Sequence, residues 1–310
     1  MAITGVLRIG EAALRVLDLE ESIVHYRDRI GLQEMARDDE GRVYFKCWDE
    51  WDHHSLVIRE ADETGLDYMA YKVSSDAALT NFEKRIRDYG VEVENIDAGV
   101  YLKSGRRIQF TIPSGHVMQL YAEKVKVGNN MPAHNPEVIP DEGIIRGMGP
   151  TRLDHILIYG PNVPECGKFF TECMDFELAE EIVKDGTDDQ LSVFLACSNK
   201  PHDIAWVEHP EPGKLHHISF FLNNEIDVYH AGDIIGKNRI SNDIGPTRHG
   251  ITRGATIYFF DPSGNRNEVF SGGYIRYPDN PPLRWDESQL GPAIFYHDGK
   301  LNESFLTVVT

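Results

Sequence analysis

The sequence predicts a mixed α+β fold with strongly curved sheets, in which strands outnumber helices. One observation is an internal repeat: PSGHVMQLY at 113–121 returns as PSGNRNEVF at 262–270, a displacement of 149 residues from 113 to 262. A second observation is that segments with strand-like alternation and segments with helical spacing follow one another in the same order in both copies. The 310 residues are therefore expected to form two copies of one unit.

Other blocks of the two copies also match. The matching pairs are 104–110 with 253–259, 66–73 with 215–222, 25–34 with 169–178, and 11–16 with 155–160. The first two pairs keep the displacement of 149 and the last two have 144, so a five-residue difference is expected in a loop between them.

Each copy is predicted to contain the pattern βαβββ twice, which gives four modules in the chain. The expected strands are 11–17, 43–48, 54–59 and 67–73 in the first copy and 153–159, 191–196, 203–208 and 215–222 in the second, with final strands ending at 121 and 270. The expected helices are 76–89 and 225–235, together with those marked by helical spacing of Ile23, Tyr26 and Ile30 and of Phe169, Cys173 and Phe176.

The boundary between the copies is predicted in the segment 124–150, which is rich in Pro, Gly and Asn. We expect a first domain at 1–130, a linker at 131–150 and a second domain at 151–271. The remaining residues, 272–310, begin with GGYIRYPDNPPLRW and are expected to form a Pro-rich tail that packs on the domains.

The charge of the chain excludes two classes of partner. A formal net charge of −19 and a pI near 5.0 would repel nucleic acids and anionic membrane surfaces. The four cysteines show no chelating spacing and suggest a reducing compartment: Cys47, Cys166, Cys173 and Cys197. Without a recognisable secretory signal or apolar spanning run, the expected location is the cytoplasm.

Three positions change together between the copies while the turns and helices around them match. The second copy has His155, His217 and Glu268, where the first has Glu11, Tyr68 and Gln119. A packing role would have been kept in both copies, so a shared task of the second copy explains the change better than three core residues. Two imidazoles and one carboxylate are typical of an open divalent-metal site, as in non-haem Fe(II) oxygenases. A zinc site of the same composition stays open, although the HExxH helix is missing.

The second copy resembles the extradiol ring-cleaving dioxygenases of the vicinal oxygen chelate superfamily, above all those that act on catechol. The motifs that carry this resemblance are LDHILIYG at 153–160, LHHISF at 215–220, GPTRHG at 245–250 and IYFFDPSGNRNEVF at 257–270. It extends over the whole chain, through RVLDLEESIVHYRDRIGL near the start and LGPAIFYHDGKLNESF near the end. The resemblance implies two open barrels of paired modules, with the metal in the C-terminal barrel and none in the N-terminal one.

The resemblance also implies an activity and its residues. The family's metal ligands correspond to His155, His217 and Glu268, and its acid–base histidine to His202. Its substrate-pocket residues correspond to His249 and Tyr258. The implied reaction is extradiol (meta) cleavage of catechol or a substituted catechol by O₂ at Fe(II), with Mn(II) as the alternative. The product would be of the 2-hydroxymuconate semialdehyde type, and the implied assembly is a homotetramer.

Several alternatives stay open from the residues. Tyr258 could be an ordinary strand aromatic, and His202 falls on His53 of the first copy, to which we assign no role; His297 is likewise unassigned. His216 is expected on the opposite side of its strand from His217, in a structural role. Rival functions are an α-keto-acid oxygenase, a Ni, Zn or Mn enzyme acting on glutathione adducts, and a two-lobed sequestering protein without turnover.

Overall fold

The computed structural model describes residues 5–310 and contains the four predicted βαβββ modules. The first copy consists of β1 (Val6–Val16), α1 (Leu19–Ile23) with the π-helical η1 (Val24–Ile30), β2 (Gln33–Arg37), β3 (Val43–Lys46), β4 (Leu56–Glu60), β5 (Gly65–Val73), α2 (Asp76–Asp88), β6 (Glu94–Ile96), β7 (Arg107–Thr111) and β8 (Val117–Tyr121). The second consists of β9 (Arg152–Gly160), α3 (Val163–Cys173), β10 (Glu177–Val183), β11 (Gln190–Ala196), β12 (Ile204–Glu208), β13 (Lys214–Phe221), α4 (Glu225–Asn238), β14 (Asn242–Arg248), β15 (Gly254–Phe260) and β16 (Arg266–Gly272).

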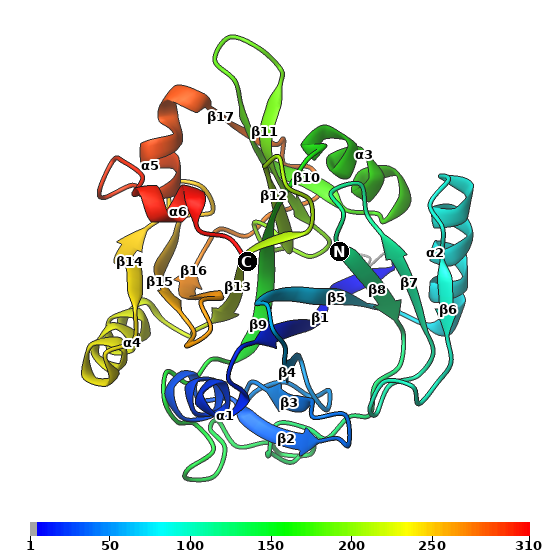
Figure 1. Cartoon of the computed structure of the whole chain (residues 1–310), viewed down its shortest axis with the longest axis vertical. Helices are drawn as coiled ribbons and strands as arrows, with labels where there is room; N and C mark the ends of the chain where they lie inside the picture. The colour runs from blue at the N-terminus through cyan, green and yellow to red at the C-terminus, as the bar shows by residue number, and fades with distance from the viewer. Residues whose placement is uncertain (1–4) are drawn as a thin grey trace.

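Each copy forms its own sheet, and the two sheets have the same strand order. The first sheet runs β2-β3-β4-β1-β5-β8-β7-β6. The second runs β14-β15-β16-β13-β9-β12-β11-β10-β17. Read from the opposite edge, and apart from the added β17, it places the corresponding strands in the same order as the first sheet. In both sheets an antiparallel pair joins the two modules, β1 with β5 and β9 with β13. Figure 1 shows the first copy in blue to cyan beside the second in green to orange, and the identical order confirms the predicted duplication.

Two long helices, α2 and α4, begin where a side chain accepts their free backbone N–H groups. Ser75 accepts from the backbone N–H of Ala78 at the start of α2, and Asn224 forms a capping box with Asp227 at the start of α4. The apolar face of α2 places Leu79, Phe82 and Ile86 in the core. This face of α2 packs against β5, β7 and β8 of the first sheet.

The repeated Pro-Ser-Gly turn of the first copy docks on the second copy. The turn between β7 and β8 places the Ser114 carbonyl 3.0 Å from the Gly213 backbone N–H, which donates to it. The Trp206 indole donates to Ser114 Oγ at 3.2 Å, and His116 Nε2 lies 2.9 Å from the Lys214 carbonyl. The motif thus has a structural reason to be present in the first copy.

The matching turn of the second copy docks on the first in the same way. Ser263 Oγ accepts from the backbone N–H of Leu17 at 2.9 Å, and the Tyr26 hydroxyl donates to Asp261 at 2.9 Å. Asn265 donates to the Arg15 carbonyl at 3.0 Å. The two lobes are therefore locked together by a reciprocal exchange of the same turn, which explains why this sequence survives in both copies.

The C-terminal tail does more than wrap around the domains. It adds β17 (Leu283–Asp286), which pairs in parallel with β10, and then forms η2 (Glu287–Gln289), α5 (Leu290–Ile294) and α6 (Glu303–Thr307). In Figure 1 the orange and red helices α5 and α6 lie beside β14 and β15 of the second sheet. The sequence predicted a wrap and a short end segment, and β17 was missed; the domain boundaries stay a prediction.

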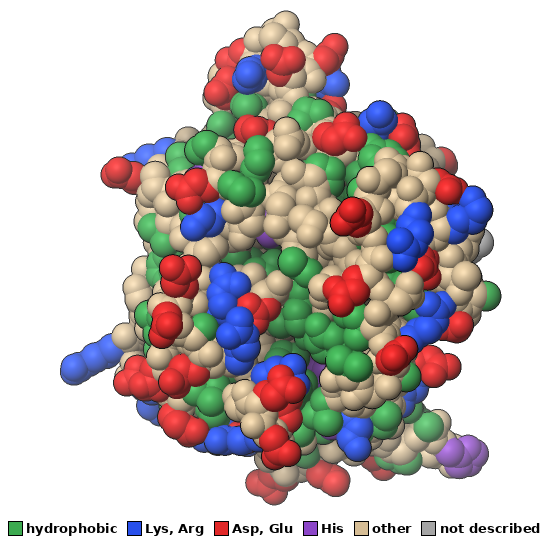
Figure 2. Space-filling model, turned by 45° about the vertical axis from the view of Figure 1, so that its right-hand side comes forward, with side chains coloured by type: hydrophobic (Ala, Val, Ile, Leu, Met, Phe, Trp, Pro, Cys, Tyr) green, Lys and Arg blue, Asp and Glu red, His purple; other side chains and the backbone are tan. Residues whose placement is uncertain are grey.

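Charged side chains are mixed over the surface. Figure 2 shows acidic and basic groups interspersed on one face of the molecule, around a recess where apolar side chains gather. Every helix within residues 5–310 lacks either the length or the apolar character required to cross a membrane.

His116 gives the docking of the lobes a testable pH dependence. Burial lowers the pKa of His116 from 6.5 to about 4, although its hydrogen bond to the Lys214 carbonyl acts in the opposite direction. Between these values the unfolded chain binds more protons than the folded one, so stability falls as the pH is lowered from 6.5 to about 4. A shift of this size is worth on the order of 3 kcal/mol.

His116→Gln keeps hydrogen-bonding capacity but cannot titrate. We therefore expect this variant to lose less stability than the unmodified protein as the pH is lowered. Urea unfolding of both proteins at pH values above 6.5 and near 4 measures it. An unchanged pH dependence in the variant would contradict the assignment.

Candidate metal centre

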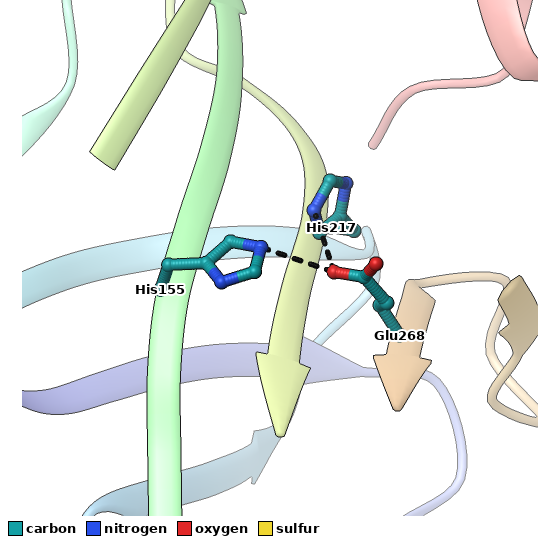
Figure 3. A group of neighbouring side chains, drawn as sticks. All are labelled: His155, His217 and Glu268. Atoms are coloured by element: carbon teal, nitrogen blue, oxygen red, sulfur yellow. Dashed lines mark ion pairs between the residues drawn. The ribbon is translucent and has the colours of Figure 1, made fainter. Parts of the chain in front are cut away.

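The three candidate ligands come from three adjacent strands, in the order β16-β13-β9. Ser219 of β13 pairs with His155 of β9 on one side and with Glu268 of β16 on the other. His217 lies two residues before Ser219, so its side chain points to the same face. The register alone therefore brings two imidazoles and a carboxylate together above a small serine, and Figure 3 shows them pointing at one another.

The distances fit a single bound ion. His155 Nε2 lies 3.0 Å and His217 Nε2 3.5 Å from Glu268 Oε2, and one potential ligand atom from each residue falls within 4.8 Å of the other two. All three side chains are buried. Within residues 5–310, His217 Nε2 and Glu268 Oε2 have no hydrogen-bond partner. Buried polar atoms without partners are costly, and a divalent cation coordinated by all three would satisfy them.

The charge at this centre comes from Glu268. Burial by itself would raise the pKa of its carboxyl, but the imidazoles of His155, His217 and His249 hold the pKa well below its usual range. Burial lowers the pKa of His217 to about 4, which keeps its ring neutral at physiological pH. An ionised carboxylate and a neutral imidazole are the protonation states that a metal ligand needs.

Neighbouring side chains orient the ligands. Asp154 Oδ2 lies 3.1 Å from His155 Nδ1 and so leaves Nε2 of that ring facing the centre. Thr256 donates to Glu268 Oε1 at 2.5 Å. Lys200 lies 3.4 Å from Asp154 and 2.8 Å from Asp203, and this bridge ties the loop before β12 to the ligand strand.

The remaining three candidate residues line the same cavity as the ligands. The ring of His202 lies 4.1 Å from that of His155, and in the described chain its buried Nδ1 has no partner. His249 Nε2 lies 2.9 Å from the Tyr258 hydroxyl, while its Nδ1 faces the carbonyl of Ile294 in α5. Tyr258 pairs with Glu268 in the β15–β16 register. The structure thus brings all six sequence-predicted residues into one cavity.

The cavity is apolar and closed by the tail. Its volume is about 210 Å³, and its walls beyond the six residues are mostly aliphatic and aromatic. The tail contributes Leu290, Ile294, Leu301, Phe305 and Leu306. None of the described cavity-lining side chains is Lys or Arg. This segment has no repeat partner in the first copy, so the sequence did not identify which of its residues line the cavity.

The predicted orientation of His216 is wrong. A β-bulge between Leu215 and His217 interrupts the pairing of β13 with β9. His216 therefore points inward, where it stacks on Tyr159 with ring centroids 4.7 Å apart. His53 and His297 do not line the cavity; His297 is exposed, and His53 Nδ1 contacts His54 Nδ1 in the first lobe at 3.0 Å.

The first lobe contains the same row of residues with a different chemistry. Ala70 pairs with Glu11 on one side and with Gln119 on the other, as Ser219 does in the second lobe. Glu11 is buried and pairs with the buried side chains of Arg107, at 2.8 Å, and Lys124. Two fixed organic cations thus balance the carboxylate here, where the second lobe presents a group suited to a metal.

Comparisons with known proteins agree with this arrangement. Residues 66–125 match the Catechol 2,3-dioxygenase-like N-terminal domain, and residues 152–269 match the Glyoxalase/Bleomycin resistance protein/Dioxygenase superfamily. The chain is 49% identical to the metapyrocatechase of Pseudomonas sp. (strain CF600), over 99% of both chains. It is 30% identical to the manganese-dependent 2,3-dihydroxybiphenyl 1,2-dioxygenase of Geobacillus genomosp. 3, over 94% of both.

Solved structures show the same similarity. The 2,3-dioxygenase LapB from Pseudomonas sp. KL28 superposes with a TM-score of 0.90 and 51% identity, covering 92% of this chain and 99% of that one. Homoprotocatechuate 2,3-dioxygenase from Brevibacterium fuscum, in complex with 3,4-dihydroxyphenylacetate, gives a TM-score of 0.87 at 25% identity, covering 97% and 92%.

Comparison of the corresponding strand positions in the two lobes predicts which substitutions should release a bound metal. His217→Ala and Glu268→Gln should lose bound divalent metal, because each removes one of three ligands. Their counterparts in the first lobe, Tyr68→Phe and Gln119→Ala, should keep the metal and change only the melting temperature. Metal analysis after gel filtration, with a thermal melt of each variant, measures both. Full metal retention in all four variants would refute the site.

Proposed function

This chain belongs to the extradiol ring-cleaving dioxygenases of the vicinal oxygen chelate superfamily, and on that premise we propose that it opens the ring of catechol or a substituted catechol with O₂. Cleavage beside the two hydroxyl groups incorporates both oxygen atoms into a 2-hydroxymuconate semialdehyde-type product. The observation that carries most weight is the 49% identity to a metapyrocatechase over 99% of the chain. The three rival functions, an α-keto-acid oxygenase, a glutathione-adduct enzyme and a sequestering protein, are not supported by an identity of this size.

We propose that His155, His217 and Glu268 hold the metal, with Fe(II) as the ion and Mn(II) as the alternative. Extradiol relatives are metal-dependent, and one of them is a manganese enzyme. Two buried atoms of this group, His217 Nε2 and Glu268 Oε2, have no hydrogen-bond partner among residues 5–310, which supports the assignment. When bound, Fe(II) would bring both reactants together and supply a route for electron density from the ring to O₂, which would relieve the spin restriction on their direct reaction.

We propose that His202 moves the substrate's proton. Its ring packs beside His155 and lines the cavity, and its Nδ1 is buried and has no hydrogen-bond partner among residues 5–310. An imidazole nitrogen with a free lone pair can accept the proton of a catechol hydroxyl and later return it during ring opening. Because His202 stands on the β11–β12 loop and not on a ligand strand, it can act without leaving the metal centre incomplete.

His249 and Tyr258 would orient the ionised oxygen of the substrate. Their polar atoms lie 2.9 Å apart on the side of the cavity next to Glu268. The Ile294 carbonyl accepts from His249 Nδ1–H, which directs Nε2 into the cavity. In the neutral ring Nε2 then accepts from the Tyr258 hydroxyl, so the two side chains would hold each other beside the substrate oxygen, and the apolar tail residues around them exclude water.

The assembly and location of the protein were also predicted. We propose a homotetramer of this enzyme, as the family resemblance implies. The cytoplasmic location inferred from the scattered thiols stays a prediction.

The first test is turnover by the Fe(II)-loaded protein. We expect one O₂ consumed per catechol, with a yellow ring-cleaved product followed by absorbance. 3,4-Dihydroxyphenylacetate should be a poorer substrate by at least about tenfold in kcat/KM, because no described cavity-lining cation can pair with its carboxylate. Neutral 4-isobutylcatechol, whose side chain has the same number of non-hydrogen atoms, serves as the size-matched control. No O₂ uptake with any catechol would overturn the function, and equal use of the acid would overturn the account of the cavity.

The second test concerns proton transfer. His202→Gln should lower kcat by about 10²-fold or more while the metal stays bound, because the glutamine cannot accept and return a proton. His53→Gln, the same change at the matching position of the first copy, should leave turnover intact. An unchanged kcat in His202→Gln would remove this residue from the mechanism.

A further inference from the structure

Two adjacent imidazoles face the inside of the second lobe. The bulge in β13 turns His216 to the same side as His217, and their Nδ1 atoms lie 2.6 Å apart. His216 Nε2 lies 2.8 Å from the backbone carbonyl of Phe305 in α6. A continuous chain of polar atoms therefore runs from the C-terminal tail to a candidate metal ligand.

Only one arrangement of hydrogens along this hydrogen-bond chain leaves His217 with a nitrogen that can bind a metal. A carbonyl oxygen only accepts, so Nε2 of His216 must carry a hydrogen and donate it. In a neutral ring the other nitrogen, Nδ1, then has a free lone pair and must accept. His217 Nδ1 accordingly carries the hydrogen that it donates to His216. The Nε2 of His217 is left with its lone pair, on the side where it faces Glu268 Oε2 at 3.5 Å.

We propose that His216 is a positioning residue that transmits the constraint of the Phe305 carbonyl to His217, fixing the tautomer and the direction of its metal-binding nitrogen. This inference rests on the proposed metal role of His217. It assigns to an imidazole the task that the Asp154 carboxylate performs for His155 on the neighbouring strand.

The contacts around His216 hold its ring in one orientation. It stacks on Tyr159, and its edge meets the ring of Phe305 with centroids 4.5 Å apart. The first copy has Asp67 and Tyr68 where the second has His216 and His217. The lobe without a candidate metal group therefore also lacks the imidazole pair, as expected if the pair serves the ligand.

The carbonyl at the other end of the chain is held as firmly. Arg266 donates to the carbonyls of Ser304 and Val308, at 2.8 and 2.9 Å, on either side of Phe305. Thr310 pairs with Leu215, next to the bulge, through two backbone hydrogen bonds of 2.7 and 3.1 Å. The tail segment that closes the cavity therefore also holds the carbonyl that orients the ligand.

The direct test is ¹⁵N NMR of the imidazoles in the metal-free full-length protein. We expect His217 in the Nδ1–H form, although the Nε2–H form is the commoner one for a free neutral imidazole. In His216→Phe, which keeps the ring contacts but removes the acceptor, the Nε2–H form should become dominant. His217 found in the Nε2–H form in the unmodified protein would overturn the proposal without any variant being needed.

Metal affinity supplies the second readout. Titration with Mn²⁺ alone should show about 10- to 100-fold weaker binding in His216→Phe, the usual effect of losing an orienting partner. His216→Gln should recover most of it, because an amide can donate to Phe305 and accept from His217. His209→Phe, which also changes a neighbour of Tyr159, should bind as the unmodified protein does.

The outcomes separate this inference from the proposed function. Equal affinity in His216→Phe and the unmodified protein, or no recovery in His216→Gln, would overturn the relay and leave the metal site standing. Metal retained in His217→Ala would overturn the site itself.

Discussion

A buried carboxylate needs a positive partner, and that requirement governs both lobes of this protein. In the second lobe Glu268 is enclosed by imidazoles and leaves an oxygen without a hydrogen bond in the described chain, as a metal ligand would. In the first lobe Glu11 is balanced by Arg107 and Lys124. An unpaired charge at either place would cost several kcal/mol, so each lobe must supply a cation of its own or bind one.

The two solutions share one scaffold. The same three-strand row, with a small residue at its centre, carries Glu11, Ala70 and Gln119 in one lobe and His155, Ser219 and Glu268 in the other. The reciprocal docking of the Pro-Ser-Gly turns keeps both lobes in register whatever their inner faces carry. The two inner faces thus differ in chemistry: one lobe balances its carboxylate with fixed charges, and the other has two imidazoles and a carboxylate beside an apolar cavity.

The modules and the metal group could be predicted by comparing the two copies, and His202, His249 and Tyr258 could be predicted through the family resemblance, whereas features set by local backbone geometry could not. Strand alternation and the comparison of copies located the modules and placed His155, His217 and Glu268 on one face. The inward turn of His216 depends on a bulge, and a bulge leaves no mark in the alternation of Leu215, His216 and His217. The tail has no counterpart in the first copy, and its backbone carbonyls at Ile294 and Phe305 act through atoms that every residue possesses.

We propose that one metal ion sits in the second lobe and that fixed cations replace it in the first. Anomalous diffraction from crystals of the Mn²⁺-loaded protein tests this most directly. The account predicts one strong peak per chain, between His155 Nε2, His217 Nε2 and an oxygen of Glu268. A peak beside Glu11, or a loaded crystal whose metal lies away from those three atoms, would contradict it.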